Sequence, residues 1–199
     1  MKTTYKILIL LFSLTIYSCQ NQPTKEEPTI LKPTPEDYKP YFQFDKVDHY
    51  FLDIGMGDAN DLATKENQTE KERRQSQLIT GWAPDKLEDS VLVKDLEKFD
   101  FVKTDIPSDS LEELNQIFHE KKQQQWEGLA CTAIYRDILV FKKHNQIVGI
   151  VKLCFHCQQH VIIGTTSDTD QFGLADEFEK LYFLLHGKNL HDYLQSGPK

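Results

Sequence analysis

The stretch that decides the fold is residues 130–165, ACTAIYRDILVFKKHNQIVGIVKLCFHCQQHVIIGT. Within it, residues 130–142, 147–155 and 160–165 are rich in β-branched, aromatic and other apolar side chains, a composition that favours strands. The polar run 143–146 predicts a turn between the first two strands. Strands joined by such short connections pair in antiparallel fashion, so we expect a β meander here.

The segments outside the meander predict further strands and helices. We expect strands at 49–54 and 99–103, and helices at 68–79, 90–98, 108–124 and 176–185. Ser110 and Glu113 fit a capping box at the start of the third helix, and Gly187 fits the C′ position after the last. The sequence therefore predicts an α+β fold, with an antiparallel β meander in the C-terminal half packed by two or three helices.

The N-terminal segment has the pattern of an export signal. Two lysines accompany an apolar run at 7–16, which is too short for a membrane-spanning helix of roughly 20 residues. The run leads to Tyr17-Ser18-Cys19, and a small residue directly before a cysteine resembles the bacterial lipobox. We therefore expect removal of residues 1–18 as a lipoprotein signal peptide and attachment of lipid, such as palmitate, to Cys19. An ordinary signal peptide followed by a chance cysteine is the alternative.

A proline-rich stretch follows Cys19 and predicts a tether. Five of the chain's eight prolines lie in residues 20–40, and polar chain of this kind is extended and semi-rigid. We assign residues 19–41 to the tether, 42–190 to a single α+β domain and 191–199 to a tail. The expected location is the outer membrane, lipid-anchored, with the domain on the periplasmic face or at the cell surface.

The charge of the chain narrows the choice of partners. The formal net charge is −8 for the whole chain, and it becomes −10 when residues 1–18, which hold two lysines and no acids, are removed. Affinity for nucleic acid depends on lysine and arginine that neutralise phosphates. We therefore expect no nucleic-acid partner, and contact with the membrane through the lipid on Cys19.

Three cysteines remain for the domain: Cys131, Cys154 and Cys157. With a turn at 143–146, residue 142 opposes 147, and Cys131 and Cys157 then lie within about one residue of each other across the ladder. An exported protein meets an oxidising compartment, so a disulfide from Cys131 to Cys157 or to Cys154 is expected. Closing a loop of about 25 residues stabilises the fold by roughly 3 kcal/mol.

Two other uses of these cysteines stay open. Cys154 and Cys157 form a Cys-x-x-Cys motif, which can act as a redox dithiol. Alternatively, Cys131, Cys154 and Cys157 with His156 or His160 supply the nitrogen and sulfur ligands that zinc or copper prefers. We expect no cofactor in the disulfide case, and zinc or copper in the metal case.

A family resemblance rests on the same region. Cys131, the run Tyr135-Arg136-Asp137 and the run 152–157, Lys-Leu-Cys-Phe-His-Cys, resemble a pattern in uncharacterised small lipoproteins and secreted proteins of Bacteroidota. The likeness covers roughly residues 110–186. It implies membership of a family of unknown function and therefore supplies no activity.

Two polar groups are weaker candidates for a site. Tyr135, Arg136 and Asp137 could face a ligand, but the expected register places Asp137 opposite Lys152, and this predicts a stabilising cross-strand pair. His49 with Asp48 and Asp53 could mark a site, although a single histidine near a strand usually has a structural role.

These observations favour a binding protein over an enzyme. The sequence contains no Gly-rich phosphate loop, no Gly-x-Ser-x-Gly elbow and no His-Glu-x-x-His motif. We therefore expect a membrane-anchored cell-envelope lipoprotein whose domain binds a protein or small molecule without catalysis. The alternative is an envelope metal-binding or thiol-redox protein that uses Cys131, Cys154 and Cys157.

Overall fold

The expected meander forms three consecutive strands in this computed structural model, β3 (Asp137–Lys143), β4 (Gln146–Cys154) and β5 (Gln159–Ile163). The structure describes residues 39–81, 83–121, 131–173 and 176–196. These residues belong to one compact unit of the chain, Pro35–Lys199. Each strand of the meander pairs with the next in antiparallel orientation.

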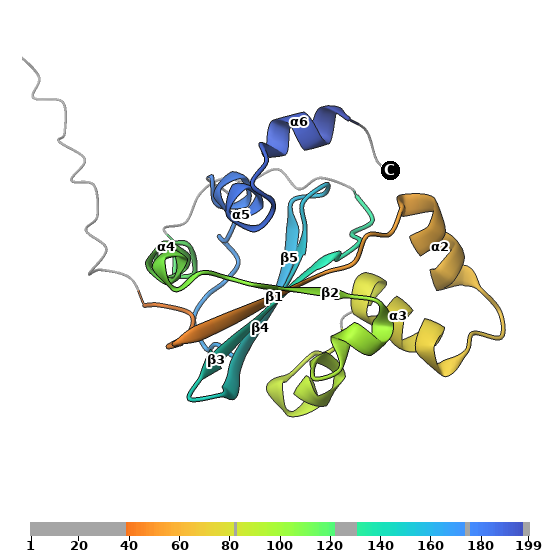
Figure 1. Cartoon of the computed structure of the whole chain (residues 1–199), viewed down its shortest axis with the longest axis horizontal. Coiled ribbons are helices and arrows are strands. Elements are labelled where there is room, and N and C mark those ends of the chain that lie inside the picture. Colours follow the sequence, from red (N-terminus) through yellow and green to blue (C-terminus); the bar gives the residue numbers. More distant parts are fainter. Residues whose placement is uncertain (1–38, 82, 122–130, 174–175, 197–199) are drawn as a thin grey trace, which may run out of the picture. The chain divides into compact units, whose positions relative to one another are not determined.

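Two earlier strands complete the sheet, β1 (Lys46–Phe51) and β2 (Val102–Asp105). The strand order is β2-β1-β3-β4-β5, and every pairing is antiparallel (Figure 1). β1 therefore lies beside β3, which follows it by more than eighty residues in the chain. The α+β class and the C-terminal meander are confirmed.

Helices cover both faces of the sheet (Figure 1). They are α2 (Met56–Thr64), α3 (Glu70–Thr80), α4 (Leu111–Ile117), α5 (Glu177–His186) and α6 (Leu190–Gln195), with short 3-10 helices η2 (Leu87–Val93), η3 (Leu96–Phe99) and η4 (Ser108–Ser110). One hydrophobic cluster joins the sheet to α2, α3, η2 and η3, and the other joins it to α4, α5 and α6. Ile138 and Val140 of β3 belong to the first cluster, while Leu139 and Phe141 belong to the second, as the twofold alternation of a strand requires.

Several element boundaries differ from expectation. β3 begins at Asp137 rather than near residue 130, because the Tyr135 amide donates to the Ile79 carbonyl of α3 instead of joining the sheet. Ser110 makes no side-chain cap at α4, so the predicted capping box is wrong there. A capping box forms instead between Thr69 and Glu72, at the start of α3.

The C-terminal part of the domain extends further than expected. α6 occupies most of the predicted tail, and Leu190 at its start is buried in the second cluster. Gly187 adopts the left-handed conformation that ends α5, as its C′ assignment predicted.

Because of a β-bulge, the observed register of β3 and β4 differs from the expected one. Lys142 opposes Ile147 as predicted, but the pairing shifts between Phe141 and Lys142, so Asp137 opposes Leu153 and Ile138 opposes Lys152. A shift of one residue moves a side chain to the other face of the sheet. The predicted pair of Asp137 and Lys152 is therefore wrong, because these two side chains lie on opposite faces.

Candidate functional site

A cavity of about 690 Å³ lies on the α5–α6 face of the sheet. Its apolar wall includes aromatic rings from four parts of the chain: Phe51, Phe155, Tyr182 and Tyr193. Its polar lining is Asp53, Arg136, Asp137, His186, Lys188, Asn189, Asp192 and Ser196. Small-molecule sites have this size and this combination of apolar walls with few convergent polar groups.

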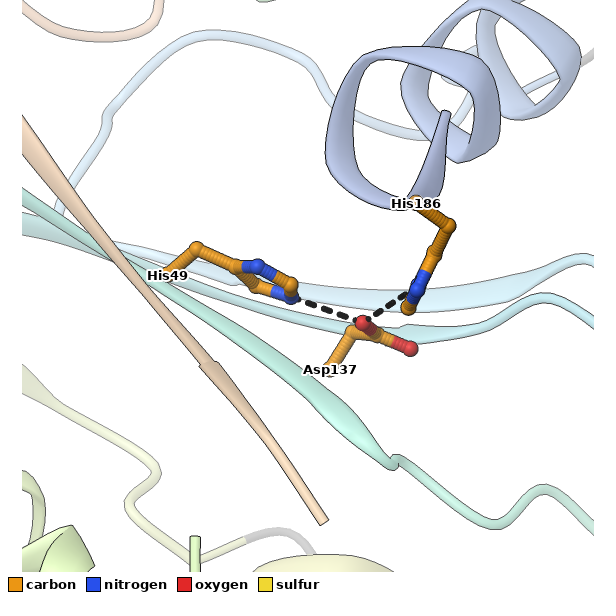
Figure 2. Close-up of side chains that lie close together, drawn as sticks. All are labelled: His49, Asp137 and His186. Atoms are coloured by element: carbon orange, nitrogen blue, oxygen red, sulfur yellow. Dashed lines mark hydrogen bonds and ion pairs between the residues drawn. The ribbon is translucent and has the colours of Figure 1, made fainter. Parts of the chain in front are cut away.

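Two histidines converge on one carboxylate at this cavity (Figure 2). His49 comes from the middle of β1, Asp137 begins β3, and His186 is the last residue of α5. The Nε2 atoms of His49 and His186 lie 2.8 and 2.9 Å from the same oxygen, Oδ1 of Asp137. The side chains of His49 and Asp137 are buried, and that of His186 is 16% exposed.

The two imidazoles decide the ionisation of Asp137. Burial alone would raise the pKa of this carboxyl, but the hydrogen bonds from His186 and His49 outweigh burial and lower the pKa below its usual value. His49 Nδ1 is buried and has no hydrogen-bond partner among the described residues. Which ring nitrogen carries the proton follows from the hydrogen-bond partners, and the contact to Asp137 is made through Nε2.

Aromatic rings hold His186 in place. Its imidazole lies 4.6 Å from the Tyr182 ring, 5.2 Å from Phe51 and 5.8 Å from Phe155, measured between ring centroids. These rings also line the cavity, so the imidazole is supported by apolar neighbours while it remains accessible from the cavity. Such packing fixes the direction of the ring toward Asp137.

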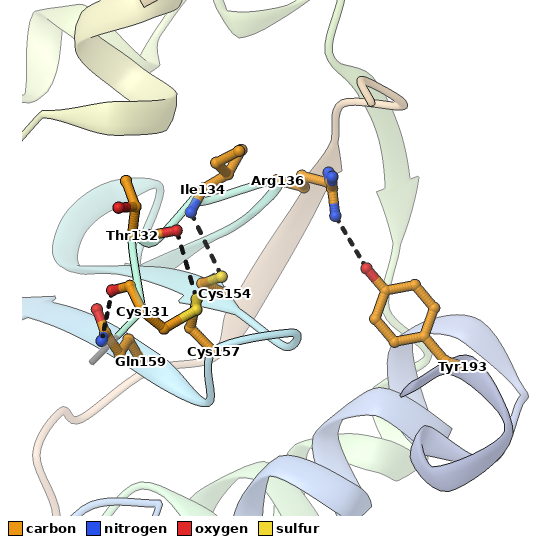
Figure 3. Close-up of a disulfide and its surroundings, with 8 residues drawn as sticks. All are labelled: Cys131, Thr132, Ile134, Arg136, Cys154, Cys157, Gln159 and Tyr193. Atoms are coloured by element: carbon orange, nitrogen blue, oxygen red, sulfur yellow. Dashed lines mark hydrogen bonds between the residues drawn. A yellow bond between two sulfur atoms is a disulfide. The ribbon is translucent and has the colours of Figure 1, made fainter. Parts of the chain in front are cut away.

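Arg136 brings a partly unsatisfied guanidinium to the same cavity. Its Nε donates to the Ile54 carbonyl at 2.6 Å, and its Nη1 donates to the Tyr193 hydroxyl at 2.9 Å (Figure 3). Its Nη2 is buried and has no hydrogen-bond partner within the described part of the chain. A buried cationic donor without an acceptor is costly, and an anionic oxygen would offset this cost.

The cysteines form a structural unit rather than a site. Cys131 and Cys157 are joined in a disulfide with a Cα–Cα distance of 5.7 Å, one of the two predicted pairings (Figure 3). Cys154 is free and buried, and its Sγ lies 3.4 Å from the Ile134 amide nitrogen, which donates to it. A dithiol of Cys154 and Cys157 is therefore not formed, because Cys157 is already bonded to Cys131.

The predicted cysteine–histidine metal site is not assembled either. Two of its three thiols are consumed by the disulfide, and His160 instead packs its ring 4.9 Å from that of Phe172. His156 lies in the turn between β4 and β5. Among the residues that the structure describes, the metal-compatible cluster of His, Cys, Asp and Glu side chains is His49, Asp137 and His186.

The remaining polar candidates are separated by the sheet. Asp48 is buried with Lys103 at 3.1 Å and Lys142, on the face opposite to His49, whereas Asp53 lines the cavity. Lys152 donates to the carbonyls of Gly81 and Ala83 at 2.6 and 3.0 Å.

Sequence reasoning named His49, Asp137 and Arg136 but missed His186. In the sequence, His186 lies one helical turn after Tyr182 and directly before Gly187. This position indicates the end of a helix, but it does not indicate what the imidazole contacts.

Comparisons with known proteins add no family assignment. The chain matches no protein-family model, no curated protein and no solved structure. In the described ranges, no helix combines the length and apolar character that crossing a bilayer requires.

Proposed function

We propose that this protein is a lipid-anchored envelope protein whose domain binds a small anionic molecule in the cavity beside α5 and α6. The observation that carries the proposal is the buried Nη2 of Arg136, which lacks a hydrogen-bond partner among the described residues and belongs to a residue of the cavity wall. Binding of this kind needs no catalytic step.

The chemistry of Arg136 selects the charge of the ligand. A guanidinium that already donates from Nε and Nη1 keeps the N–H groups of Nη2, and a carboxylate or phosphate oxygen is their strongest acceptor. Charge-assisted hydrogen bonds strengthen where water is excluded. Lys188 adds a second cation to the lining.

The apolar wall of the cavity favours a ligand that has an apolar portion beside its charged group. Phe51, Phe155, Tyr182 and Tyr193 present aromatic surface around the polar groups. Aromatic rings prefer offset or edge-to-face contact with other rings. An aromatic carboxylate therefore fits both the wall and the guanidinium.

Anchoring is the second part of the proposal. The apolar run at 7–16 and Cys19 support attachment to the outer membrane, and the proline-rich stretch after Cys19 supports a spacer between lipid and domain. Residues 1–38 lie outside the described residues, so this part rests on the sequence pattern. The thiol-redox alternative is not favoured, because Cys131 and Cys157 are bonded and Cys154 is buried.

Calorimetric titration of the purified full chain with phenylacetate, phenyl phosphate and the neutral phenylacetamide tests the proposal. We expect at least one anion to bind with a dissociation constant on the order of 1 mM or tighter, and the amide to bind at least about tenfold more weakly. Arg136→Met should abolish anion binding, since it removes the charge and keeps an apolar stem.

Lys98→Met is the matched control, because Lys98 is 72% exposed on η3, which packs on the opposite face of the sheet. It should bind the anion as the wild type does. Failure of both anions to bind, or equal binding by Arg136→Met, would contradict the proposal.

A further inference from the structure

We infer that His49, Asp137 and His186 form a binding site for a divalent transition-metal ion at the wall of the cavity. This site goes beyond the proposed anion binding and stands on its own geometry. It also differs from the cysteine-based metal site that the sequence suggested, since it contains no cysteine. Each residue offers one ligand atom, and these atoms lie within 4.8 Å of one another.

The ligand atoms lie close to the separations that a shared ion requires. Nitrogen and oxygen ligands bind zinc at about 2.0–2.2 Å, so two ligands at the tetrahedral angle on one ion lie about 3.4 Å apart, a few tenths of an ångström more than hydrogen-bonded atoms. The two Nε2–Oδ1 distances are 2.8 and 2.9 Å. The two nitrogens must come within about 4.2 Å of each other. All three ligand atoms already lie within 4.8 Å of one another, so only a small adjustment separates them from this limit.

The charge of the cluster favours a cation. Asp137 contacts the two imidazoles, and no lysine or arginine of the described residues lies within ion-pair distance of its carboxylate. Apart from the two imidazoles, the buried carboxylate has no cationic partner in the described ranges. Buried carboxylates are normally paired or bound to a metal, because an isolated buried charge is costly. A divalent ion would supply this compensation.

The surroundings leave room for an ion to enter and for further ligands. Asp137 and His186 both line the cavity, so the free coordination positions of the ion would face it. The aromatic rings around His186 limit its movement and lower the local polarity, which strengthens electrostatic attraction. Two imidazoles and one carboxylate with open positions are a ligand set suited to zinc or iron(II).

Titration of the chelator-treated full chain with Zn²⁺ alone tests the site. We expect one ion per chain, and X-ray absorption of the zinc-loaded protein should show two imidazoles and a carboxylate oxygen. His186→Gln and Asp137→Asn should each weaken zinc binding by more than the roughly 10–100-fold typical of residues that only support ligands. His144→Gln is the matched control, because His144 is 84% exposed in the β3–β4 turn.

The outcomes separate this inference from the anion proposal. Zinc binding that survives in Arg136→Met supports an independent metal site, even if no anion binds. If circular dichroism shows that a variant does not fold, the X-ray absorption spectrum of the zinc-loaded wild-type protein tests the site instead. Absence of zinc binding, an absorption spectrum without two imidazoles, or equal affinity in folded His186→Gln and the wild type would overturn the inference.

Discussion

Lys152 shows how a single residue can link the sheet to a distant loop. Its side chain is fully buried, and its ammonium group donates to the carbonyls of Gly81 and Ala83 and lies 4.8 Å from the centre of the Tyr135 ring. Burial lowers the pKa of Lys152 to about 7. The hydrogen bonds of Lys152 therefore connect the end of α3 and the loop after it to β4. Burial of the charged ammonium group is unfavourable.

We predict that Lys152 makes stability depend on pH. Above about pH 7 the folded chain releases this proton, while the unfolded chain keeps it up to its ordinary pKa of about 10.4. Because the unfolded state binds more protons in this window, the free energy of unfolding should rise with pH, by up to about 1.4 kcal/mol per unit. Urea denaturation from pH 7 to 9.5 measures the slope.

In Lys152→Met this rise should disappear, whereas the exposed control Lys98→Met should retain it. The same slope in wild type and Lys152→Met would show that the ammonium stays charged in the folded state.

Among the strands and helices, the β3–β4 hairpin differs most from the expected register. The bulge between Phe141 and Lys142 turns Asp137 toward α5 and Lys152 toward α3. Gly149 lies opposite Phe141 in this hairpin, and a Cβ there would overlap the ring of Phe42. At position 149 of this hairpin there is therefore room for glycine alone.

We predict that Gly149→Ala destabilises the fold by about 1–3 kcal/mol, since overpacking forces Phe42 or the strand to move. Gly57→Ala in α2 is the matched control: a Cβ there meets nothing within 4 Å, so the change should be neutral or slightly stabilising. Guanidinium denaturation of both variants compares the two sites. Equal stability of the two variants would refute the close packing of Phe42 on Gly149.

The disulfide joins the chain before β3 to the β4–β5 turn. It closes a loop with a sequence separation of 26. We predict that the double substitution Cys131→Ser and Cys157→Ser lowers the free energy of unfolding by about 3 kcal/mol, because the unfolded chain gains loop freedom. The wild type measured with reductant should approach the double variant.

Cys154→Ala keeps the bridge and serves as the control for loss of a thiol. If wild type and double variant unfold at the same denaturant concentration, the bridge contributes nothing to stability.

For the whole molecule, the anchoring proposal makes its own prediction. Cells grown with labelled palmitate should incorporate the label into this chain, and Cys19→Ala should remove it, since the acyl chains attach at that residue. Fractionation should place the wild type with the outer membrane and the variant in the soluble fraction. Unlabelled wild-type protein with an intact N-terminus in the cytosol would rule out the anchor.

Local sequence patterns alone predicted the three strands of the meander and α5, but they missed α6. The periodicity of residues 130–165 is local, so it predicted the meander and placed Cys131 near Cys157. The same local reasoning found α3, α5 and the left-handed Gly187. It did not find the bulge, since no local pattern marks where the register shifts by one residue.

The candidate site depends on contacts between distant parts of the chain. His49 is 88 residues from Asp137, and His186 is 49 residues from it, so no local pattern indicates that the three meet. Their meeting depends on β1 pairing with β3 and on α5 packing across that face of the sheet. Periodicity tells which residues share a face of one element, but it does not tell which elements become neighbours, because that choice is made by the packing of the whole core.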